Sequence, residues 1–320
     1  MSIVLRAIRG RPSPLFRRRV GWFSAASDGA YIYVLGGVDQ NFTTTATLWR
    51  YDPISNTYNT SLPSYTIPTY FHASVYLNGK IYRIAGRAIG TDFHVEVYDI
   101  ATNTCSIAVN YPFANHSLMA AAVGSYVYAG GGNASSDKTY RYDPATDTWE
   151  DAAIADLPAG RSAAASGAYN GRWLLAGGDV NFAISTSAIA WDPATNTWNN
   201  LPNMVQPRDN LGGATAGQSF YAVAGNSAPG TPTNDNQPYT ETCTTSTPTP
   251  TETLTHLQVR RRRHQILIRR VRRRQLQHWP PHLQQGAPSA TPTATSTPRV
   301  TPTPRVAPTP RPRPTPVPCL

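Results

Sequence analysis

The chain has 320 residues and a formal net charge of +10 at pH 7, but this charge is unevenly distributed. Residues 1–19 contain six Arg and no acidic residue, and residues 244–320 contain thirteen Arg against one Glu. Residues 20–243 contain nine basic and seventeen acidic side chains, a net charge of −8. The basic character belongs to the two ends, so the bulk charge does not indicate a body that binds nucleic acid.

The few cysteines and the short apolar runs argue against several further classes of protein. Cys105, Cys243 and Cys319 form no CxxC pair, which argues against a disulfide framework and a structural zinc site. No apolar run reaches the ~20 residues of a transmembrane helix, and the apolar stretch near Met1 is too short for a signal peptide. We expect no metal ion and no cofactor.

The chain opens with the basic segment 1–19, in which residues 2–8 (SIVLRAI) form a short apolar stretch that can make a strand. From residue 20 to residue 243 two landmarks recur in phase. The octet YDPATDTW at 142–149 returns as WDPATNTW at 191–198, with weaker copies at 51–58 and 98–105. A small-residue pair follows each apolar run, and its last residues are Gly37, Gly86, Gly132, Gly178 and Gly225.

Each unit predicts four short strands. A small-residue strand (a) leads to an apolar strand (b) that ends at the glycine pair, a third strand (c) ends at the Asp, and a fourth (d) begins at the Trp. Four strands in each unit of about 45 residues are typical of a propeller blade. The structural repeat residues are Gly36, Gly37, Asp52, Gly86, Asp99, Gly131, Gly132, Asp143, Trp149, Gly177, Gly178, Asp192, Trp198 and Gly225.

These landmarks resemble the kelch repeat, which combines a double glycine, a Tyr before the Asp-Pro and a Trp six residues after the Asp. The resemblance covers residues 20–225 and implies an all-β, kelch-type β-propeller of about five four-stranded blades. Two units depart from it with Ala85 and Ala224 in the glycine pair, and two with Tyr58 and Cys105 at the Trp position. Because kelch propellers serve as enzymes, adaptors and adhesion modules alike, the resemblance predicts fold more sharply than function.

The fifth unit lacks a second Asp-Pro and a Trp, so one outer strand has no evident source after residue 225. Two alternatives remain open. Residues 2–8 supply the strand and close a five-bladed ring, or the chain is a fragment whose earlier blades precede Met1. An uncovered outer edge would favour aggregation.

The segment 244–320 is a low-complexity Thr/Pro/Arg-rich tail, for which we expect a disordered stalk of the bacterial kelch type. Within it, residues 256–285 hold nine Arg. Twenty-five of these thirty residues are Leu, Pro, His, Gln or Arg, the amino acids that a Thr-Pro repeat encodes when it is shifted by one base. A frameshifted stalk, a solvated basic linker and a polyanion-binding site are the three interpretations.

We expect no catalytic residue. His72 enters a strand a and is expected to be structural, His94 is expected to face solvent, and Cys105 is expected to be buried and inert. Glu96 lies within one strand with Asp99 and indicates no site by itself. The repeated Asp residues belong to turns.

Binding is better supported, because the b–c and d–a loops share one face and do not follow the repeat. The candidate binding residues on this face are Phe42, Arg87, Phe113, His116, Arg161, Phe182 and Arg208. For Arg161 and Arg208, which occupy equivalent repeat positions, the alternative is a structural role that holds the d–a loops.

The sequence therefore predicts a monomeric, non-enzymatic binding or adhesion module for a protein or glycan, at the cell surface or outside the cell. Nucleic acid is not an expected partner of the propeller. The alternatives are a carbohydrate-active propeller enzyme and a polyanion-binding tail.

Overall fold

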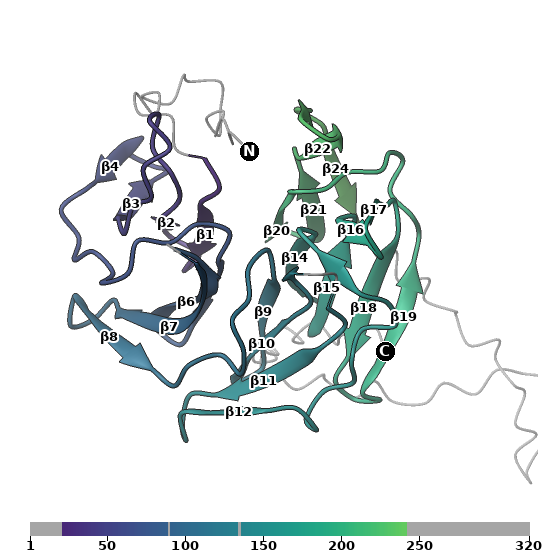
Figure 1. Ribbon diagram of the computed structural model, residues 1–320, viewed down its shortest axis with the longest axis horizontal. Helices are drawn as coiled ribbons and strands as arrows, with labels where there is room; N and C mark the ends of the chain where they lie inside the picture. Colours follow the sequence, from purple (N-terminus) through teal and green to yellow (C-terminus); the bar gives the residue numbers. More distant parts are fainter. Residues whose placement is uncertain (1–20, 89, 134–135, 242–320) are drawn as a thin grey trace, which may run out of the picture. The chain divides into compact units, whose positions relative to one another are not determined.

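The computed structural model describes residues 21–88, 90–133 and 136–241. These residues belong to the first of two compact units into which the chain divides; the second comprises residues 243–317. The predictions for residues 1–19, with the strand at 2–8, and for residues 244–320, with the Arg-rich stretch at 256–285, lie outside the described residues. Every strand-forming unit predicted between residues 20 and 243 is present, and the all-β fold class is confirmed (Figure 1).

Four antiparallel four-stranded sheets follow one another along the chain as blades 1 to 4, each with its strands a to d in spatial order. Blade 1 comprises β1 (Ser24–Ser27), β2 (Ile32–Leu35), β3 (Leu48–Asp52) and β4 (Thr57–Asn59). Blade 2 comprises β5 (Ala73–Leu77), β6 (Lys80–Arg87), β7 (Thr91–Asp99) and β8 (Thr104–Ala108). Blade 3 comprises β9 (Met119–Val123), β10 (Tyr126–Gly130), β11 (Thr139–Asp143) and β12 (Thr148–Glu150). Blade 4 comprises β14 (Ala165–Tyr169), β15 (Arg172–Ala176), β18 (Ala188–Asp192) and β19 (Thr197–Leu201).

Blade 5 has three strands among the described residues, as the fifth unit predicts. They are β20 (Gly212–Ala216), β21 (Ser219–Val223) and β24 (Asn236–Tyr239), and β24 is the outermost. Two small sheets lie in the loops. One joins β13 (Arg161–Ser162), β16 (Asp179–Val180) and β17 (Ala183–Ile184), and the other joins β22 (Asn226–Ala228) and β23 (Thr231–Pro232).

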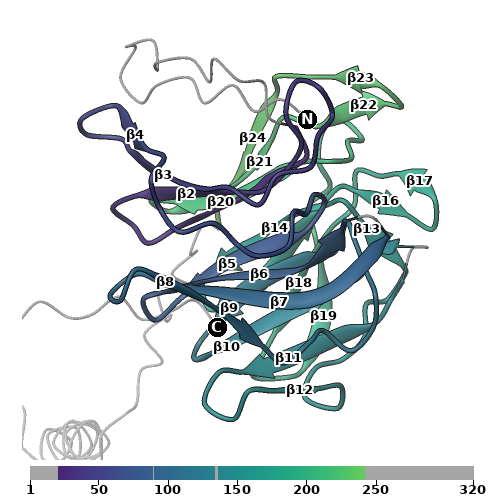
Figure 2. The ribbon, with the colours of Figure 1, turned by 60° about the vertical axis from the view of Figure 1, so that its left-hand side comes forward.

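Small side chains on strand a allow the inner strands of successive blades to pack closely. β1 contacts β5, β5 contacts β9, β9 contacts β14, and β14 contacts β20. Figure 2 shows β5, β9 and β14 close to one another. A Cβ atom added to Gly213 on β20 would collide with the backbone of Ser166 on β14, so a larger residue would separate these blades. Apolar side chains of strands b and c fill the space between the blades.

The glycine pair at the end of strand b has a left-handed backbone in all five blades. Its first residue has φ between 52° and 67°, a value that Ala85 and Ala224 adopt as well as Gly36, Gly131 and Gly177. The second residue is always Gly, with φ between 83° and 123°. A Cβ at Gly37 would lie 2.5 Å from the carbonyl oxygen of Gly21. The second position of the pair is therefore restricted to glycine by both conformation and space, whereas the first is occupied by alanine in blades 2 and 5.

The octet forms the turn between strands c and d. The Asp143 carboxylate accepts a hydrogen bond from the amide of Ala145 at 2.8 Å, and the Tyr142 hydroxyl donates to Asp147 at 2.7 Å. Trp149 Nε1 donates to the carbonyl oxygen of Val109 at the end of blade 2. The octet of blade 3 thus forms the turn of its own blade and binds the preceding one through Trp149.

Candidate functional site

One residue just before each strand a occupies an equivalent position, fifteen residues before the last glycine of the pair. Each of the five has a left-handed backbone with φ between 49° and 58°, although none is glycine. The five entry residues are Trp22, Phe71, Ser117, Ala163 and Asn210. Bulky residues rarely adopt this conformation, so the strain at Trp22 and Phe71 is notable among the five.

Backbone hydrogen bonds connect the entry residues from blade to blade. The Phe71 amide donates to Trp22 O at 3.1 Å, the Ser117 amide to Phe71 O at 2.7 Å, and the Ala163 amide to Ser117 O at 2.8 Å. The series continues from the Leu211 amide to Ala163 O at 3.4 Å. This chain of bonds fixes the backbone at the entry positions. The backbone orientation there in turn determines which side chains of the entry residues lie on the loop face.

The aromatic entry residues of blades 1 and 2 gather other rings around them. The Trp22 ring lies 4.9 Å from the Phe71 ring, 5.4 Å from Tyr70 in a stacked arrangement, and 6.1 Å from Phe42, measured between centroids. The Phe71 ring lies 6.2 Å from the imidazole of His116. We call Trp22, Phe42, Tyr70, Phe71 and His116 the aromatic cluster.

The aromatic cluster is accessible and lies near one positive charge. Phe42 is 75% exposed at the tip of its b–c loop, and the other four members are half-buried. Burial and the nearby charge of the exposed Arg87 lower the pKa of His116, so its imidazole is neutral at pH 7. Two of the predicted binding residues, Phe42 and His116, thus belong to the aromatic cluster, and a third, Arg87, lies near His116.

Arg161 and Arg208, by contrast, point into the fold. Arg161 is 3% exposed and donates to Gly177 O at 2.6 Å and Ser187 O at 3.0 Å. Arg208 is 1% exposed and donates to Ala224 O at 2.9 Å and Asp235 O at 3.0 Å. Burial lowers the pKa of Arg161 to about 10. The geometry corresponds to the alternative in which both residues hold the d–a loops.

Each of these loops is held in two directions. The carbonyl oxygen of Arg161 accepts from the amide of Gly132 in blade 3, while its side chain reaches Gly177 in blade 4. The carbonyl of Asn115 likewise accepts from Gly86 in blade 2, and its side-chain amide donates to Gly131 O in blade 3 at 2.8 Å. The d–a loops thus link the glycine pairs of adjacent blades.

In blade 2 the guanidinium that binds the carbonyl oxygen of the first residue of the glycine pair comes from a strand and not from the d–a loop. The equivalent loop residue is Thr69, and the guanidinium comes from Arg83 on β6, whose Nη1 donates to Ala85 O at 3.0 Å. Nη2 of Arg83 lies 2.7 Å from Glu96, and Nη1 lies 3.1 Å from Asp92. All three charged side chains are buried. Burial opposes ionisation of Asp92, but hydrogen bonds from His94 and Arg83 outweigh it and lower its pKa.

The remaining predicted binding residues lie elsewhere. Phe113 is half-buried and packs 5.2 Å from the ring of Tyr111 and 6.0 Å from that of Tyr140, in the core between blades 2 and 3. Phe182 is 79% exposed on the b–c loop of blade 4, with φ 67°. Neither belongs to the aromatic cluster.

The ionisable residues of the types used in catalysis or metal binding lie in different parts of the propeller. His72 is buried beside Arg83, and burial followed by the charge of Arg83 lowers its pKa to about 3. Cys105 is half-buried with a free thiol, whose pKa burial raises to about 11. Asp179 and Asp209 directly follow Gly178 and Arg208, whose backbones share a hydrogen bond of 2.7 Å, and burial together with the charge of Asp209 raises the pKa of Asp179. In the described ranges no group of three or more His, Cys, Asp or Glu could hold a metal ion.

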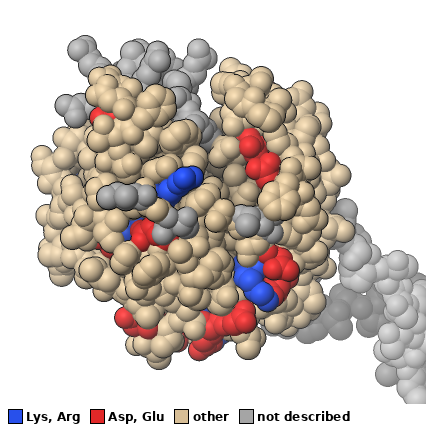
Figure 3. All heavy atoms as spheres, viewed as in Figure 1, with Lys and Arg blue, Asp and Glu red and all other residues tan. Residues whose placement is uncertain are grey.

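The surface is poor in charge. Figure 3 shows that uncharged residues make up most of the face seen in Figure 1. Within the part of the chain that the structure describes, no helix has the length and apolarity to cross a bilayer.

Trp22, Phe71 and Arg83 were missed from the sequence, although a signal existed for each. The entry position recurs at a constant distance from the glycine, so comparison of the five units at that position would have singled out its two aromatic residues. Arg83 and Glu96 lie in the interior of strands b and c of one unit, between apolar residues, and they are direct cross-strand partners. A matched pair of this kind indicates a buried ion pair.

Comparison with known proteins agrees with this architecture. The chain is 27% identical over 218 residues to Kelch-like protein 25 of Xenopus tropicalis, covering 63% of this chain and 36% of that protein. It is 28% identical over 195 residues to Kelch-like protein 35 of Mus musculus, covering 59% of this chain and 32% of that protein. Kelch-like protein terF of Aspergillus terreus is 25% identical over 235 residues, covering 66% of this chain and 50% of that protein. The chain thus spans between a third and a half of the length of these relatives.

The solved structure of YjhT matches with a TM-score of 0.59 at 16% identity, over 71% of this chain and 83% of that one. No family model matches the chain. Together with the five repeated units, these similarities support a kelch-repeat protein and confirm the kelch-type propeller fold. The bacterial stalk type predicted from residues 244–320 stays a prediction.

Proposed function

We propose that this chain is a binding module that holds a protein or glycan partner on its loop face, at the aromatic cluster of Trp22, Phe42, Tyr70, Phe71 and His116. The observation that carries the proposal is the convergence of these rings, from two blades and the loop of a third, beside the exposed Arg87. Kelch propellers commonly serve as binding modules, and aromatic and Arg residues are frequent anchors of recognition surfaces.

The chemistry of the cluster favours a partner with an apolar, flat face. Aromatic rings provide a large contact area at a low cost in side-chain entropy, and they stack on sugar rings, aliphatic groups and guanidinium planes. Arg87 supplies hydrogen-bond donors at the edge of the platform, and the neutral His116 supplies an acceptor or a donor. The net charge of −8 on residues 20–243 disfavours a polyanion on the propeller.

A matched pair of variants tests the proposal. Phe42 and Phe182 are both exposed phenylalanines with left-handed backbones on b–c loops, but only Phe42 contacts the aromatic cluster through Trp22. A ligand is first found by screening the full chain on an array of immobilised oligosaccharides and by pull-down of defined candidate proteins. Phe42→Ala is then expected to weaken binding about 10-fold or more, and Phe182→Ala to change it little.

The control is the melting temperature, which is expected to stay near the wild-type value in both variants because each ring is largely exposed. Equal losses in the two variants, or no loss in Phe42→Ala, would reject the aromatic cluster as the binding surface. Arg161 and Arg208 are unsuitable for this test, since their replacement changes the fold of the d–a loops.

A carbohydrate-active enzyme is the second candidate, and the proximity of Asp179 and Asp209 is the observation that favours it. Glycoside hydrolysis uses two carboxyl groups, one of which keeps its proton through a raised pKa. The raised pKa of Asp179 and the position of Asp209, 9% exposed, fit this pattern. Release of reducing sugar from an array glycan, abolished in Asp179→Asn, would establish an enzyme in place of a binding module.

A further inference from the structure

A belt of residues runs along the loop face from blade to blade. Within a blade, the residue before the entry residue pairs through its backbone with the residue after the glycine pair, as Tyr70 pairs with Arg87 and Asp209 with Asn226. In blades 1 to 4 the second glycine of the pair also donates to the d–a loop of the next blade. The residues at these two positions, which we call the belt, are Gly21, Val38, Tyr70, Arg87, His116, Asn133, Ser162, Asp179, Asp209 and Asn226.

The charged residues of the belt lie at two separate places. Arg87 lies in blade 2 beside the aromatic cluster, whereas Asp179 and Asp209 lie in blades 4 and 5. Uncharged belt residues of blades 3 and 4 separate the two places. The entry residues next to the acids are Ala163 and Asn210, where blades 1 and 2 have large rings. We call Asp179 and Asp209 the acidic pair.

The acidic pair lacks a hydrogen-bond donor. Asp209 is 9% exposed, and its Oδ1 atom is buried without a hydrogen-bond partner among the described residues. The guanidinium of the adjacent Arg208 binds carbonyl oxygens instead. Burial and the charge of Asp209 both raise the pKa of Asp179, the direction expected where no cation lies nearby. Neighbouring carboxylates without a donor are costly, so a cationic donor from a ligand would remove this cost.

The chemistry of the acidic pair favours an organic cation. Carboxylates bind guanidinium and ammonium groups through charge-assisted hydrogen bonds, which are stronger in a partly buried site. Calcium takes about six to eight oxygen ligands, and in the described ranges no third His, Cys, Asp or Glu joins the acidic pair. The net charge of −8 on residues 20–243 favours the approach of a basic partner.

We propose that the acidic pair binds an Arg or Lys side chain of a protein partner whose apolar side chains lie on the aromatic cluster. The belt extends from the cluster in blades 1 and 2 to the acidic pair in blades 4 and 5, so a ligand that contacts both places is an extended peptide segment. This inference rests on the proposed binding function and names its partner class. In this role the two carboxylates hold a cation and do not act as the acid and base of the enzyme candidate.

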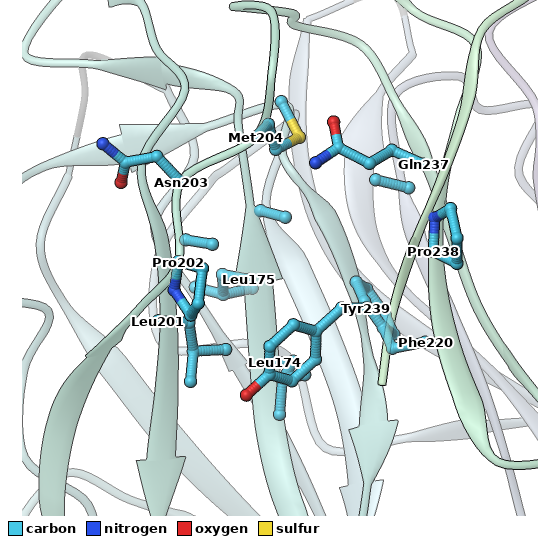
Figure 4. A pocket seen from close by; sticks show the side chains of 13 residues that line it. Leu174, Leu175, Leu201, Pro202, Asn203, Met204, Phe220, Gln237, Pro238 and Tyr239 are labelled. Carbon is cyan, nitrogen blue, oxygen red and sulfur yellow. The ribbon is translucent and has the colours of Figure 1, made fainter. Parts of the chain in front are cut away.

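The d–a loop that carries Asp209 also borders a cavity, which provides a control. The cavity lies between blades 4 and 5, with a volume of about 120 Å³ and a lining without charged side chains. Pro202, Asn203 and Met204 of the loop lie on one side of it, and Gln237 and Pro238 lie on the other (Figure 4). A substitution at the exposed Asn203 therefore changes the same loop without changing the charge of the acidic pair.

Peptide binding by the full chain tests the proposal. The probe is an array of synthetic peptides in which each Arg or Lys has a counterpart with neutral citrulline or norleucine. We expect the basic peptides to bind at least about 10-fold more tightly. Asp179→Asn and Asp209→Asn are each expected to weaken this binding about 10-fold or more. Asp151→Asn, which removes an exposed carboxylate of blade 3, and Asn203→Ala are expected to change it little.

The melting temperature of the free protein provides a second readout. Replacement of either acid removes the repulsion between two carboxylates that lack a donor. We therefore expect Asp179→Asn and Asp209→Asn to raise the melting temperature by about 2 °C or more, which shows that weaker binding does not come from a damaged fold. A lowered melting temperature in both variants would indicate a structural role and overturn the proposal.

Equal binding of basic and neutral peptides, unchanged binding in both variants of the acidic pair, or an equal loss in Asp151→Asn would also overturn it. So would a loss of binding on addition of EDTA, because the acidic pair would then hold a metal ion. Phe42→Ala separates this inference from the proposed function. If Phe42→Ala weakens binding and the variants of the acidic pair do not, this inference alone fails. If the reverse holds, the acidic pair is the binding site and the aromatic cluster is rejected.

Discussion

Blade 2 and blades 4 and 5 satisfy the same backbone acceptor in different ways. In blades 4 and 5 a guanidinium from the d–a loop, that of Arg161 or Arg208, binds the carbonyl oxygen of the first residue of the glycine pair. In blade 2 the guanidinium of Arg83 comes from strand b and brings two buried acidic partners, Asp92 and Glu96. The same carbonyl oxygen of the glycine pair is the acceptor in all three blades, whereas the guanidinium that donates to it comes from different positions.

This difference has a consequence for the loop face. Because Arg83 satisfies the carbonyl from inside the sheet, the d–a loop of blade 2 needs no long polar side chain and carries Thr69, followed by Tyr70 and Phe71. Those two rings form part of the aromatic cluster. In blades 4 and 5 the entry residues are Ala163 and Asn210, and their loops contribute no ring to the cluster. In blade 2 the residue that satisfies the backbone carbonyl, Arg83, is thus distinct from the rings of the proposed binding surface.

The largest expected effect comes from removing the guanidinium of blade 2. Arg83→Ala leaves Asp92 and Glu96 buried without their cationic partner, so we expect a loss of about 4 kcal/mol in the free energy of unfolding, measured by urea denaturation. The control is Arg83→Leu combined with Asp92→Asn and Glu96→Gln, which is expected to recover most of the loss because no buried charge remains unpaired. A loss no greater than that of Arg161→Ala would contradict this distinction between the blades.

A smaller loss is expected in blade 4. Arg161→Ala removes hydrogen bonds to two carbonyl oxygens, but Arg161 has no acidic partner in the described structure, and its desolvation is relieved at the same time. We expect a loss of about 2 kcal/mol in urea denaturation. Arg87→Ala is the matched control, since this side chain is exposed, and its stability is expected to change by less than about 0.5 kcal/mol. Similar losses in the two variants would argue against the structural role of Arg161.

The third effect depends on pH and concerns His72, whose pKa the charge of Arg83 lowers in addition to burial. The folded-state pKa of about 3 is below the unfolded value of about 6.5, so the unfolded state binds the proton first as the pH falls. The contribution is full above pH 6.5 and decreases toward pH 3. Between pH 7.5 and pH 5, wild-type protein is expected to lose about 2 kcal/mol more than His72→Leu in urea denaturation. Parallel losses would show that His72 does not titrate in this way.

Sequence periodicity is sufficient for the fold because each blade repeats the same local requirements. The second glycine of the pair has no substitute at its backbone angle, and the Asp of the octet forms its turn through contacts within three residues. Such features depend on neighbours in sequence, so they could be predicted unit by unit. The incomplete fifth blade could be predicted in the same way, because its unit lacks the second Asp-Pro and the Trp.

The site was only partly predictable. Phe42, Arg87 and His116 were predicted as binding residues of the loop face, but the approach of Phe42 to Trp22 joins two loops of blade 1, and that of His116 to Phe71 joins successive blades. Arg161 and Arg208 have the same residue type as Arg87 and lie in the same kind of loop, yet they turn inward to backbone carbonyls. Sequence near these residues does not distinguish the two orientations.

By itself, the sequence determined the phase of the repeated units, the strand order within each blade and the location of the variable loops, because these follow from short-range backbone geometry repeated at a fixed interval. Only the tertiary structure decided which side chains satisfy the carbonyls of the glycine pairs, which rings meet on the loop face and where a cavity lies between blades 4 and 5. Those outcomes depend on packing between blades, where residues about fifty positions apart come into contact and compete for the same space.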